Sequence, residues 1–171
     1  MSKIFKLALI LGAFTSMATI AVAAVNTVTA PIIQENFNAL FNDTVEEMFP
    51  TGVVGMIYEE AGPYDNRVIR VLDGENGPIL GFIYEQQVMG WAGTITYLVA
   101  VDPEGNFLAF TALSHSETAG IGAVIDEPVW EEMVRSTHAS QRIDNIAGAT
   151  VTIQTIADAL QTIYPDLQNR R

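Results

Sequence analysis

Apolar residues fill the first part of the chain without interruption by charge. From Leu7 to Val25 the sequence LALILGAFTSMATIAVAAV contains no charged side chain over 19 residues. As a helix this run is about 29 Å long, which matches the hydrocarbon core of a bilayer and predicts a membrane-spanning helix. Lys3 and Lys6 precede it. They favour a single-pass topology in the cell's inner or plasma membrane, with the N-terminus cytoplasmic and the C-terminal part outside.

A cleavable signal peptide is the competing interpretation of the same segment. Ala21-Val22-Ala23 has the small-x-small form of a cleavage site. However, the apolar run exceeds the roughly 7–15 residues of a signal peptide's apolar region. The helical pattern also continues past it, and Pro31 is where the helix is predicted to kink or restart. We therefore favour a retained anchor over residues 1–30.

A second helical pattern follows in IIQENFNALFNDTVEEMF, residues 32–49. Its apolar residues recur every three or four positions, which is typical of an amphipathic helix. We predict a juxtamembrane helix within residues 31–50 that ends at Pro50. Its apolar positions are Ile33, Phe37, Leu40, Phe41, Val45 and Met48.

Beyond Pro50, β-branched and aromatic runs alternate with turn residues, a pattern typical of strands. The segment Asp102-Pro103-Glu104-Gly105-Asn106 has the composition of a turn and joins two of the runs as a hairpin. Strands are predicted at Val53–Tyr58, Val68–Leu72, Ile79–Tyr84, Thr94–Val101 and Phe107–Leu113.

Two helices are predicted after the strands. Pro128 suits the first turn of a short helix over Pro128–Arg135. A longer helix from about Thr152 to Tyr164 is indicated by one apolar face. Strands followed by helices predict an α+β domain over residues 51–165, with a mostly antiparallel twisted sheet and flanking helices. The tail, residues 166–171, is expected to fray. The apolar face comprises Ile153, Ile156, Ala157, Leu160 and Ile163.

Charge and cysteine content narrow the possible partners and sites. Residues 31–171 hold six Lys or Arg and all twenty Asp or Glu, a net charge of −14. Such a surface repels nucleic-acid phosphates and attracts cations or basic protein surfaces. The chain has no cysteine, which excludes disulfides and iron–sulfur ligation by this chain. Its two histidines argue against a zinc site.

The first candidate binding segment is SHSETAGIG, residues 114–122. Gly120 and Gly122 allow the backbone to approach a flat or phosphorylated ligand closely. His115 near Glu117 would suit acid–base work, but no nucleophile pattern such as G-x-S-x-G accompanies them. Taken alone, this pattern does not distinguish a binding loop from an ordinary polar loop.

The second candidate segment is DNIAGAT, residues 144–150, just before the last helix. The hydroxyl of Thr150 is placed where it could cap that helix. A helix N-terminus also favours phosphate, because its N–H groups are unpaired and carry partial positive charge. Gly148 and Ala149 leave room for such a group, and a phosphate esterified to Thr150 would sit where the helix dipole favours it. From the residues alone, cap and phosphate tether both remain open.

Together the two segments resemble the FMN-binding domain of the G subunit of Rnf-type ion-translocating electron-transport complexes. The related C subunit of sodium-pumping NADH:quinone oxidoreductases shares these features. In that family S-H-x-E-T-P-G-L-G precedes D-x-x-[S/T]-G-A-T-x-T by a few dozen residues; here they are SHSETAGIG and DNIAGATVT. Residues 90–95, GWAGTI, are similar to the family's G-Y-x-G-x-I, and residues 25–33, VNTVTAPII, to its V-N-x-x-T-x-P-I-I. The resemblance covers residues 7–36 and about 81–160, and it favours the retained anchor.

The resemblance implies that a flavin transferase esterifies the phosphate of FMN to the Thr150 hydroxyl. It implies no catalytic residue and no substrate active site in this chain. Ala147 stands where the family has Ser or Thr, Ala119 and Ile121 replace Pro and Leu, and Ile153 replaces a common Ser. The implied transferase recognition residues are Asp144, Gly148, Ala149 and Thr150; those lining the isoalloxazine are Glu117, Thr118, Gly120, Ile121 and Gly122; and Thr152 is expected near the phosphate.

The function implied by the resemblance is electron relay through covalent FMN. The chain would be a subunit of a membrane complex that couples ferredoxin–NAD electron transfer to sodium or proton translocation. Its partners would be polytopic and iron–sulfur subunits, and the small residues of its membrane segment suit packing against other helices. Two alternatives stay open: a free-standing membrane-anchored extracytoplasmic flavoprotein that reduces an external acceptor, and a non-redox assembly subunit. Those small residues are Gly12, Ala13, Ser16, Ala18, Ala21 and Ala24.

Overall fold

The structure, a computed structural model, describes residues 3–59, 66–144 and 146–170. Within these ranges a few side chains are not described, including those of Phe37 and Leu40, which were predicted as apolar helix positions. The chain forms two compact units that divide between Phe41 and Asn42.

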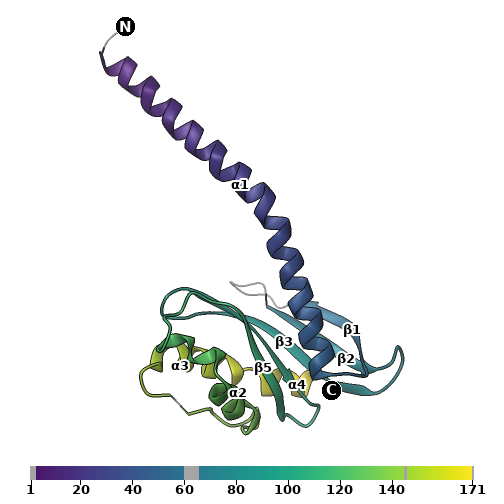
Figure 1. The fold of residues 1–171 in the computed structure, drawn as a ribbon. Coiled ribbons are helices and arrows are strands. Elements are labelled where there is room, and N and C mark those ends of the chain that lie inside the picture. The colour runs from purple at the N-terminus through teal and green to yellow at the C-terminus, as the bar shows by residue number, and fades with distance from the viewer. Residues whose placement is uncertain (1–2, 60–65, 145, 171) are drawn as a thin grey trace. The chain divides into compact units, whose positions relative to one another are not determined.

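The described part of the N-terminal unit is helical throughout. It forms most of the long helix α1 (Lys3–Met48), drawn in purple and blue in Figure 1. By length and composition, Lys3–Ile33 could cross a membrane, with a mean hydropathy of 2.1 and no burial against protein. Threonine hydroxyls in this stretch donate to carbonyls one turn earlier, as Thr27 does to Ala23 (2.8 Å). Their polar groups are therefore satisfied without water, as a bilayer core requires.

Pro31 lies inside α1, whereas the sequence predicted a kink or restart there and a separate juxtamembrane helix beyond it. A proline removes only one backbone hydrogen bond from a helix, and the helix continues on both sides of it. The helix ends at Met48, two residues before Pro50.

The described part of the C-terminal unit contains five antiparallel strands in the spatial order β1-β2-β3-β4-β5. With its flanking helices, this confirms the predicted α+β fold. β3 runs five residues further than predicted because its polar end finds partners: Glu85 accepts from Arg67 Nε (2.8 Å), and Gln86 accepts from the Tyr97 hydroxyl (2.7 Å). The strands are β1 (Gly52–Glu59), β2 (Arg67–Asp73), β3 (Ile79–Met89), β4 (Thr94–Val101) and β5 (Phe107–Ser114).

Helices cover one face of this sheet, as Figure 1 shows in green and yellow. The core between them is aromatic: Tyr97 stacks on Phe110 with ring centroids 5.0 Å apart, and Phe110 meets Trp130 edge to face at 5.6 Å. The elements are the 3₁₀ helix η1 (Gly122–Asp126) and the α-helices α2 (Pro128–Arg135), α3 (Thr150–Leu160) and α4 (Ile163–Arg170).

The other face of the sheet carries Gly81, Ile83 and Val71, by the alternation of side chains along each strand. Ile83 and Val71 are fully buried. Phe49, just after α1, packs here: a Cβ on Gly81 would lie 2.7 Å from its ring. Both faces of the central strands are thus covered within the C-terminal unit.

Two predictions about the C-terminal end were wrong. The single helix predicted up to Tyr164 is two helices, and the tail predicted to fray is helical up to Arg170. Pro165 falls in the first turn of α4, where its missing N–H costs nothing. Leu167 is fully buried, and Asp166 accepts a hydrogen bond from the Tyr84 hydroxyl (2.9 Å). These contacts to the sheet hold the end of the chain in place.

Candidate functional site

Three segments distant in sequence meet at one end of the helical face. They are the β3–β4 turn (residues 90–93), the loop after β5 (residues 114–122) and the start of α3 (residues 150–152). The meeting point is the carboxylate of Glu117, which bonds to both of the other segments. The two segments singled out from the sequence are therefore neighbours in space.

Thr150 is the first helical residue of α3, and its side chain is exposed. The N-cap position belongs to Ala149, whose methyl group cannot cap the helix, and no side-chain cap bond is present. Among the residues that the structure describes, the Thr150 hydroxyl has no hydrogen-bond partner. Gly148, with φ of +92°, makes the turn into the helix and has open space around it. The hydroxyl is thus presented outward beside the unpaired N–H groups of the first turn.

The loop after β5 is divided into an exposed and a buried part. Thr118, Gly120 and Ile121 are exposed, while Gly122 is buried. A tight turn closes the exposed part: the Ile121 and Ala123 N–H groups both donate to the Thr118 carbonyl (3.1 and 3.2 Å), and Gly120 has φ of +73°.

Glu117 is only 8% exposed, and both of its carboxylate oxygens accept hydrogen bonds. Oε1 accepts from the backbone N–H of Ala92 (2.8 Å), and Oε2 accepts from the hydroxyl of Thr152 (2.6 Å). Its side chain therefore faces the protein. The buried Thr152 hydroxyl points to Glu117, a partner that the sequence did not suggest.

His115 holds the backbone of this loop through a hydrogen bond. Its Nδ1 accepts the Glu117 N–H (3.1 Å), so its Nε2 carries the proton that bonds to Asp126 Oδ2 (2.8 Å). Both ring nitrogens of His115 are therefore engaged in holding the loop, and the acid–base role considered from the sequence finds no support in this arrangement.

Exposed apolar side chains flank these hydrogen bonds. Trp91 is 74% exposed, Ile121 53% and Val151 48%, and each is the chain neighbour of a residue packed at Glu117. Large exposed apolar side chains on three segments that meet at one residue are a signal of binding. Trp91 and the Ala92 N–H were not predicted as site residues from the sequence. The tryptophan within GWAGTI was the available signal.

The remaining predicted residues lie at the approach to α3. Asp144 and Ala147 are exposed, and Ala149 is buried with its N–H donating to the Ile146 carbonyl (3.2 Å). Neither Lys nor Arg occurs in residues 90–93, 114–122 or 144–152. A phosphate at Thr150 would therefore meet N–H groups rather than a cationic side chain from these segments.

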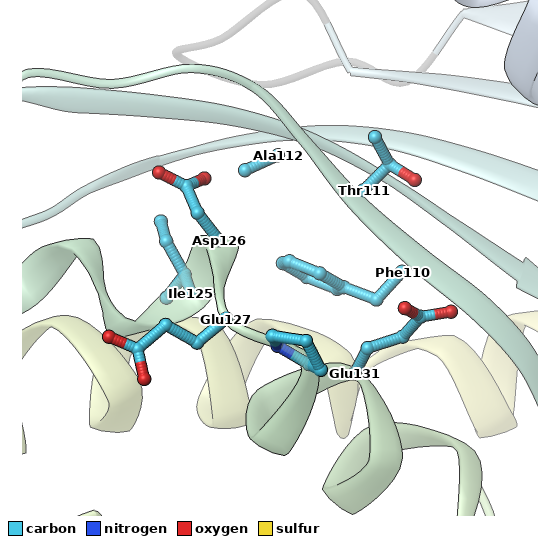
Figure 2. A pocket seen from close by; sticks show the side chains of 8 residues that line it. Phe110, Thr111, Ala112, Ile125, Asp126, Glu127 and Glu131 are labelled. Atoms are coloured by element: carbon cyan, nitrogen blue, oxygen red, sulfur yellow. The ribbon is translucent and has the colours of Figure 1, made fainter.

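A separate hollow of about 270 Å³ lies between β5 and the start of α2. Figure 2 shows the carboxylates of Asp126, Glu127 and Glu131 around the ring of Phe110. None of the predicted flavin-site residues lines it.

Two known protein families together match most of the chain. The family described as FMN-binding domain matches residues 90–164, which contain the three segments that meet at Glu117. The family described as RnfG N-terminal region matches residues 1–39, which contain the candidate membrane span.

Individual relatives agree with these families. The chain is 27% identical to the G subunit of the Na(+)-translocating ferredoxin:NAD(+) oxidoreductase complex of Acetobacterium woodii, over 97% of this chain and 92% of that protein. It is 23% identical to the G subunit of the proton-translocating ferredoxin:NAD(+) oxidoreductase complex of Clostridium ljungdahlii, over 83% and 80%. It is 29% identical to the G subunit of the ion-translocating oxidoreductase complex of Methanosarcina acetivorans, where the match spans about half (51%) of each chain.

Proposed function

The chain belongs to the family of G subunits of Rnf-type ion-translocating oxidoreductases, and we propose that it relays electrons through FMN esterified to Thr150. The observation that carries this proposal is the geometry of Thr150. Its hydroxyl is exposed, makes no bond to the described residues, and stands at a helix N-terminus that it does not cap. A hydroxyl in that position is free to form an ester, and the helix end stabilises the charge that the phosphate retains.

The surroundings support FMN as the esterified group. The exposed side chains of Trp91, Ile121 and Val151 offer apolar surface that a flat ring system can cover. Thr118 and the Gly120 backbone, also exposed, supply polar groups for the edge of such a ring. When bound, the flavin supplies the one- and two-electron chemistry, and the protein's part is to hold and orient it.

The charge of the site favours a covalent link over ionic binding of free FMN. Arginine and lysine side chains are common partners of phosphate, yet the three segments contain neither. A phosphoester needs no cation to keep the flavin in place. This also suits a domain outside the cell, where dissociated FMN would be diluted and not replaced.

The wider role follows from the family. We place the domain on the extracytoplasmic side, anchored by the candidate span Lys3–Ile33, in a complex with polytopic and iron–sulfur subunits. There it would pass electrons between neighbouring redox centres during ferredoxin–NAD electron transfer coupled to sodium or proton transport. The G subunits of a sodium-translocating and a proton-translocating ferredoxin:NAD(+) oxidoreductase complex match most of the chain.

Attachment is tested by expressing the full chain with its flavin transferase. The expected result is a mass gain of one FMN less one water, in-gel flavin fluorescence, and a fluorescent peptide that contains Thr150. Thr150→Val should remove all three. Thr155→Val is the matched control, because Thr155 lies in the same helix and its hydroxyl donates within that helix, to the Val151 carbonyl (2.9 Å). Flavin retained in Thr150→Val would place the attachment elsewhere.

Membrane extraction tests the complex. If the subunit purifies from native membranes together with polytopic and iron–sulfur proteins, the relay within a complex is supported. Recovery as a lone flavoprotein would instead support the free-standing carrier.

A further inference from the structure

The carboxylate of Glu117 connects two segments that would otherwise be independent. The β3–β4 turn contributes the Ala92 N–H, and helix α3 contributes the Thr152 hydroxyl. Each donor takes a different oxygen, and hydrogen bonds to an ionised acceptor are stronger than those between neutral groups. Because the side chain is nearly buried, water competes little for these bonds.

Two glycines leave the space that this carboxylate fills. A Cβ on Gly90 would lie 2.5 Å from Glu117 Oε1, and a Cβ on Gly122 would lie 2.1 Å from Oε2. Real Cβ atoms do not approach oxygen so closely, so any larger residue would displace the carboxylate. The backbone on both sides thus fits closely around Glu117.

The backbone of Glu117 is fixed as well. His115 accepts its N–H and is itself bonded to Asp126 at the end of η1. The loop, the β3–β4 turn and the first turn of α3 are therefore joined through one residue. Thr150 is two residues before Thr152 in the same helical turn, so fixing Thr152 also fixes the backbone position of Thr150 and the direction of its Cα–Cβ bond.

We propose that Glu117 is a positioning residue for the flavin: by holding Thr152, it presents the Thr150 hydroxyl to the transferase and keeps the attached flavin against the 90–93 turn. This inference rests on the proposed attachment at Thr150. It assigns Glu117 a bridging role between backbone segments, in place of direct contact with the isoalloxazine.

Thr152→Val removes the donor hydroxyl at nearly constant volume, and Glu117→Gln retains the shape but can satisfy only one of the two donors as an acceptor. In full-length protein, the transferase is supplied with a flavin dinucleotide; its phosphoanhydride bond breaks as the Thr150 oxygen bonds to the FMN phosphorus, and the nucleoside monophosphate leaves with the hydroxyl proton. We expect both variants to slow the initial rate of this transfer about tenfold or more, because misplacing a reacting group is costly. The FMN that does attach should show lower fluorescence anisotropy and a changed reduction potential. Thr152→Ser, which keeps the hydroxyl, should restore the wild-type rate and anisotropy.

Thr155→Val is the matched control for a Thr-to-Val change in α3, and it should attach FMN at the wild-type rate. The double variant Glu117→Gln/Thr152→Val shows whether the two single variants slow attachment through loss of the same Thr152–Glu117 hydrogen bond or through two independent defects. If one bond is responsible, the double variant is no slower than the worse single variant. Multiplied effects in the double variant would overturn the proposal.

Wild-type attachment rate and anisotropy in both single variants would also overturn it. The same outcome would leave the proposed function intact as long as Thr150→Val remains bare. Retention of flavin by Thr150→Val would instead contradict the attachment site itself. Circular dichroism of each variant before flavin attachment shows whether it folds, and the folded Thr152→Ser and Thr152→Val pair decides the case if Glu117→Gln does not fold.

Discussion

Glu117 and Gly122 approach each other so closely that a Cβ on Gly122 would stand 2.1 Å from Glu117 Oε2 and 2.9 Å from its Cβ. Gly122→Ala should therefore push Glu117 away from Thr152. We expect a loss of about 1–3 kcal/mol in the free energy of unfolding, as for overpacking in a core. Slower FMN attachment should accompany it. Urea unfolding and in-gel flavin fluorescence measure the two effects.

Gly120→Ala and Gly74→Ala are the controls for backbone strain. Both glycines have φ of +73° and open space around them, so both substitutions strain the backbone alike, by about 1–2 kcal/mol. Gly74 lies in the β2–β3 turn, away from the site. We expect equal losses of stability in Gly120→Ala and Gly74→Ala. FMN attachment should be slower in Gly120→Ala and Gly122→Ala, which lie in the candidate site, and unchanged in Gly74→Ala. A wild-type attachment rate in Gly122→Ala would contradict the close fit around Glu117.

The two tryptophans report on different parts of the C-terminal unit. Trp130 is fully buried and Trp91 largely exposed. In Trp130→Phe only Trp91 emits, at the long wavelength of an exposed indole. If FMN is held near the 90–93 turn, its attachment should strongly quench this emission relative to the bare Thr150→Val/Trp130→Phe protein. Equal emission from the two proteins would show that the flavin does not approach Trp91.

Trp130→Phe should also be a mild substitution for a large buried residue. Among the described residues, its indole N–H has no hydrogen-bond partner, so replacement loses packing but no hydrogen bond. A cost of about 1–3 kcal/mol in the free energy of unfolding is expected, as for a change of shape in a core. Urea unfolding of the full chain measures it. A larger loss would indicate that the indole N–H is bonded.

Burial raises the pKa of the Tyr97 hydroxyl well above its usual range. Its neutral form therefore contributes stability that is fully present below about pH 10, the pKa of an unfolded tyrosine. Above that pH the unfolded state loses a proton that the folded state keeps, so stability should fall by about 1.4 kcal/mol per pH unit. Tyr97→Phe should lack this part of the decline.

Comparison of urea unfolding between pH 8 and about pH 11 tests this dependence, with the difference between wild type and Tyr97→Phe as the quantity of interest. At pH 8 the variant should already be less stable by about 1–3 kcal/mol, because Gln86 Oε1 loses its donor inside the core. Parallel pH curves for the two proteins would show that Tyr97 ionises as easily in the folded as in the unfolded state.

The sequence predicted the elements where periodicity is local and strong. Pro128–Arg135 was predicted with its observed bounds, and the five strands were found in place. Prediction failed where distant partners decide. The polar end of β3 is a strand because of Arg67 and Tyr97, and α4 is ordered because Leu167 is buried and Tyr84 bonds to Asp166.

The same distinction holds at the candidate site. Motif resemblance singled out both loops, and the structure brings them together. It could not reveal that Glu117 faces Thr152 and Ala92, because those contacts join residues 35 and 25 positions away. Trp91 was part of a recognised motif, but its exposure depends on the folded turn.

Substitution of Ala147 can show whether the rate of FMN attachment depends on the stability of the fold or on recognition of this turn by the transferase. It is exposed in the turn before Gly148, and the resemblance places a hydroxyl residue there in relatives. Ala147→Ser should change the free energy of unfolding by less than about 0.5 kcal/mol, as surface substitutions usually do. Any effect on FMN attachment must then come from recognition, and we expect a faster initial rate with unchanged final stoichiometry.

A hydroxyl introduced at position 147 could itself accept the flavin, so the double variant Ala147→Ser/Thr150→Val is needed. Position 147 precedes α3 and lacks the helix N-terminus that stabilises a phosphate at Thr150. The double variant should therefore remain bare by intact mass. If it carries FMN, the position of the acceptor depends on the transferase alone, and the helix end is not what selects Thr150. If it stays bare while Ala147→Ser attaches FMN faster, recognition and acceptor geometry are separate properties of this turn.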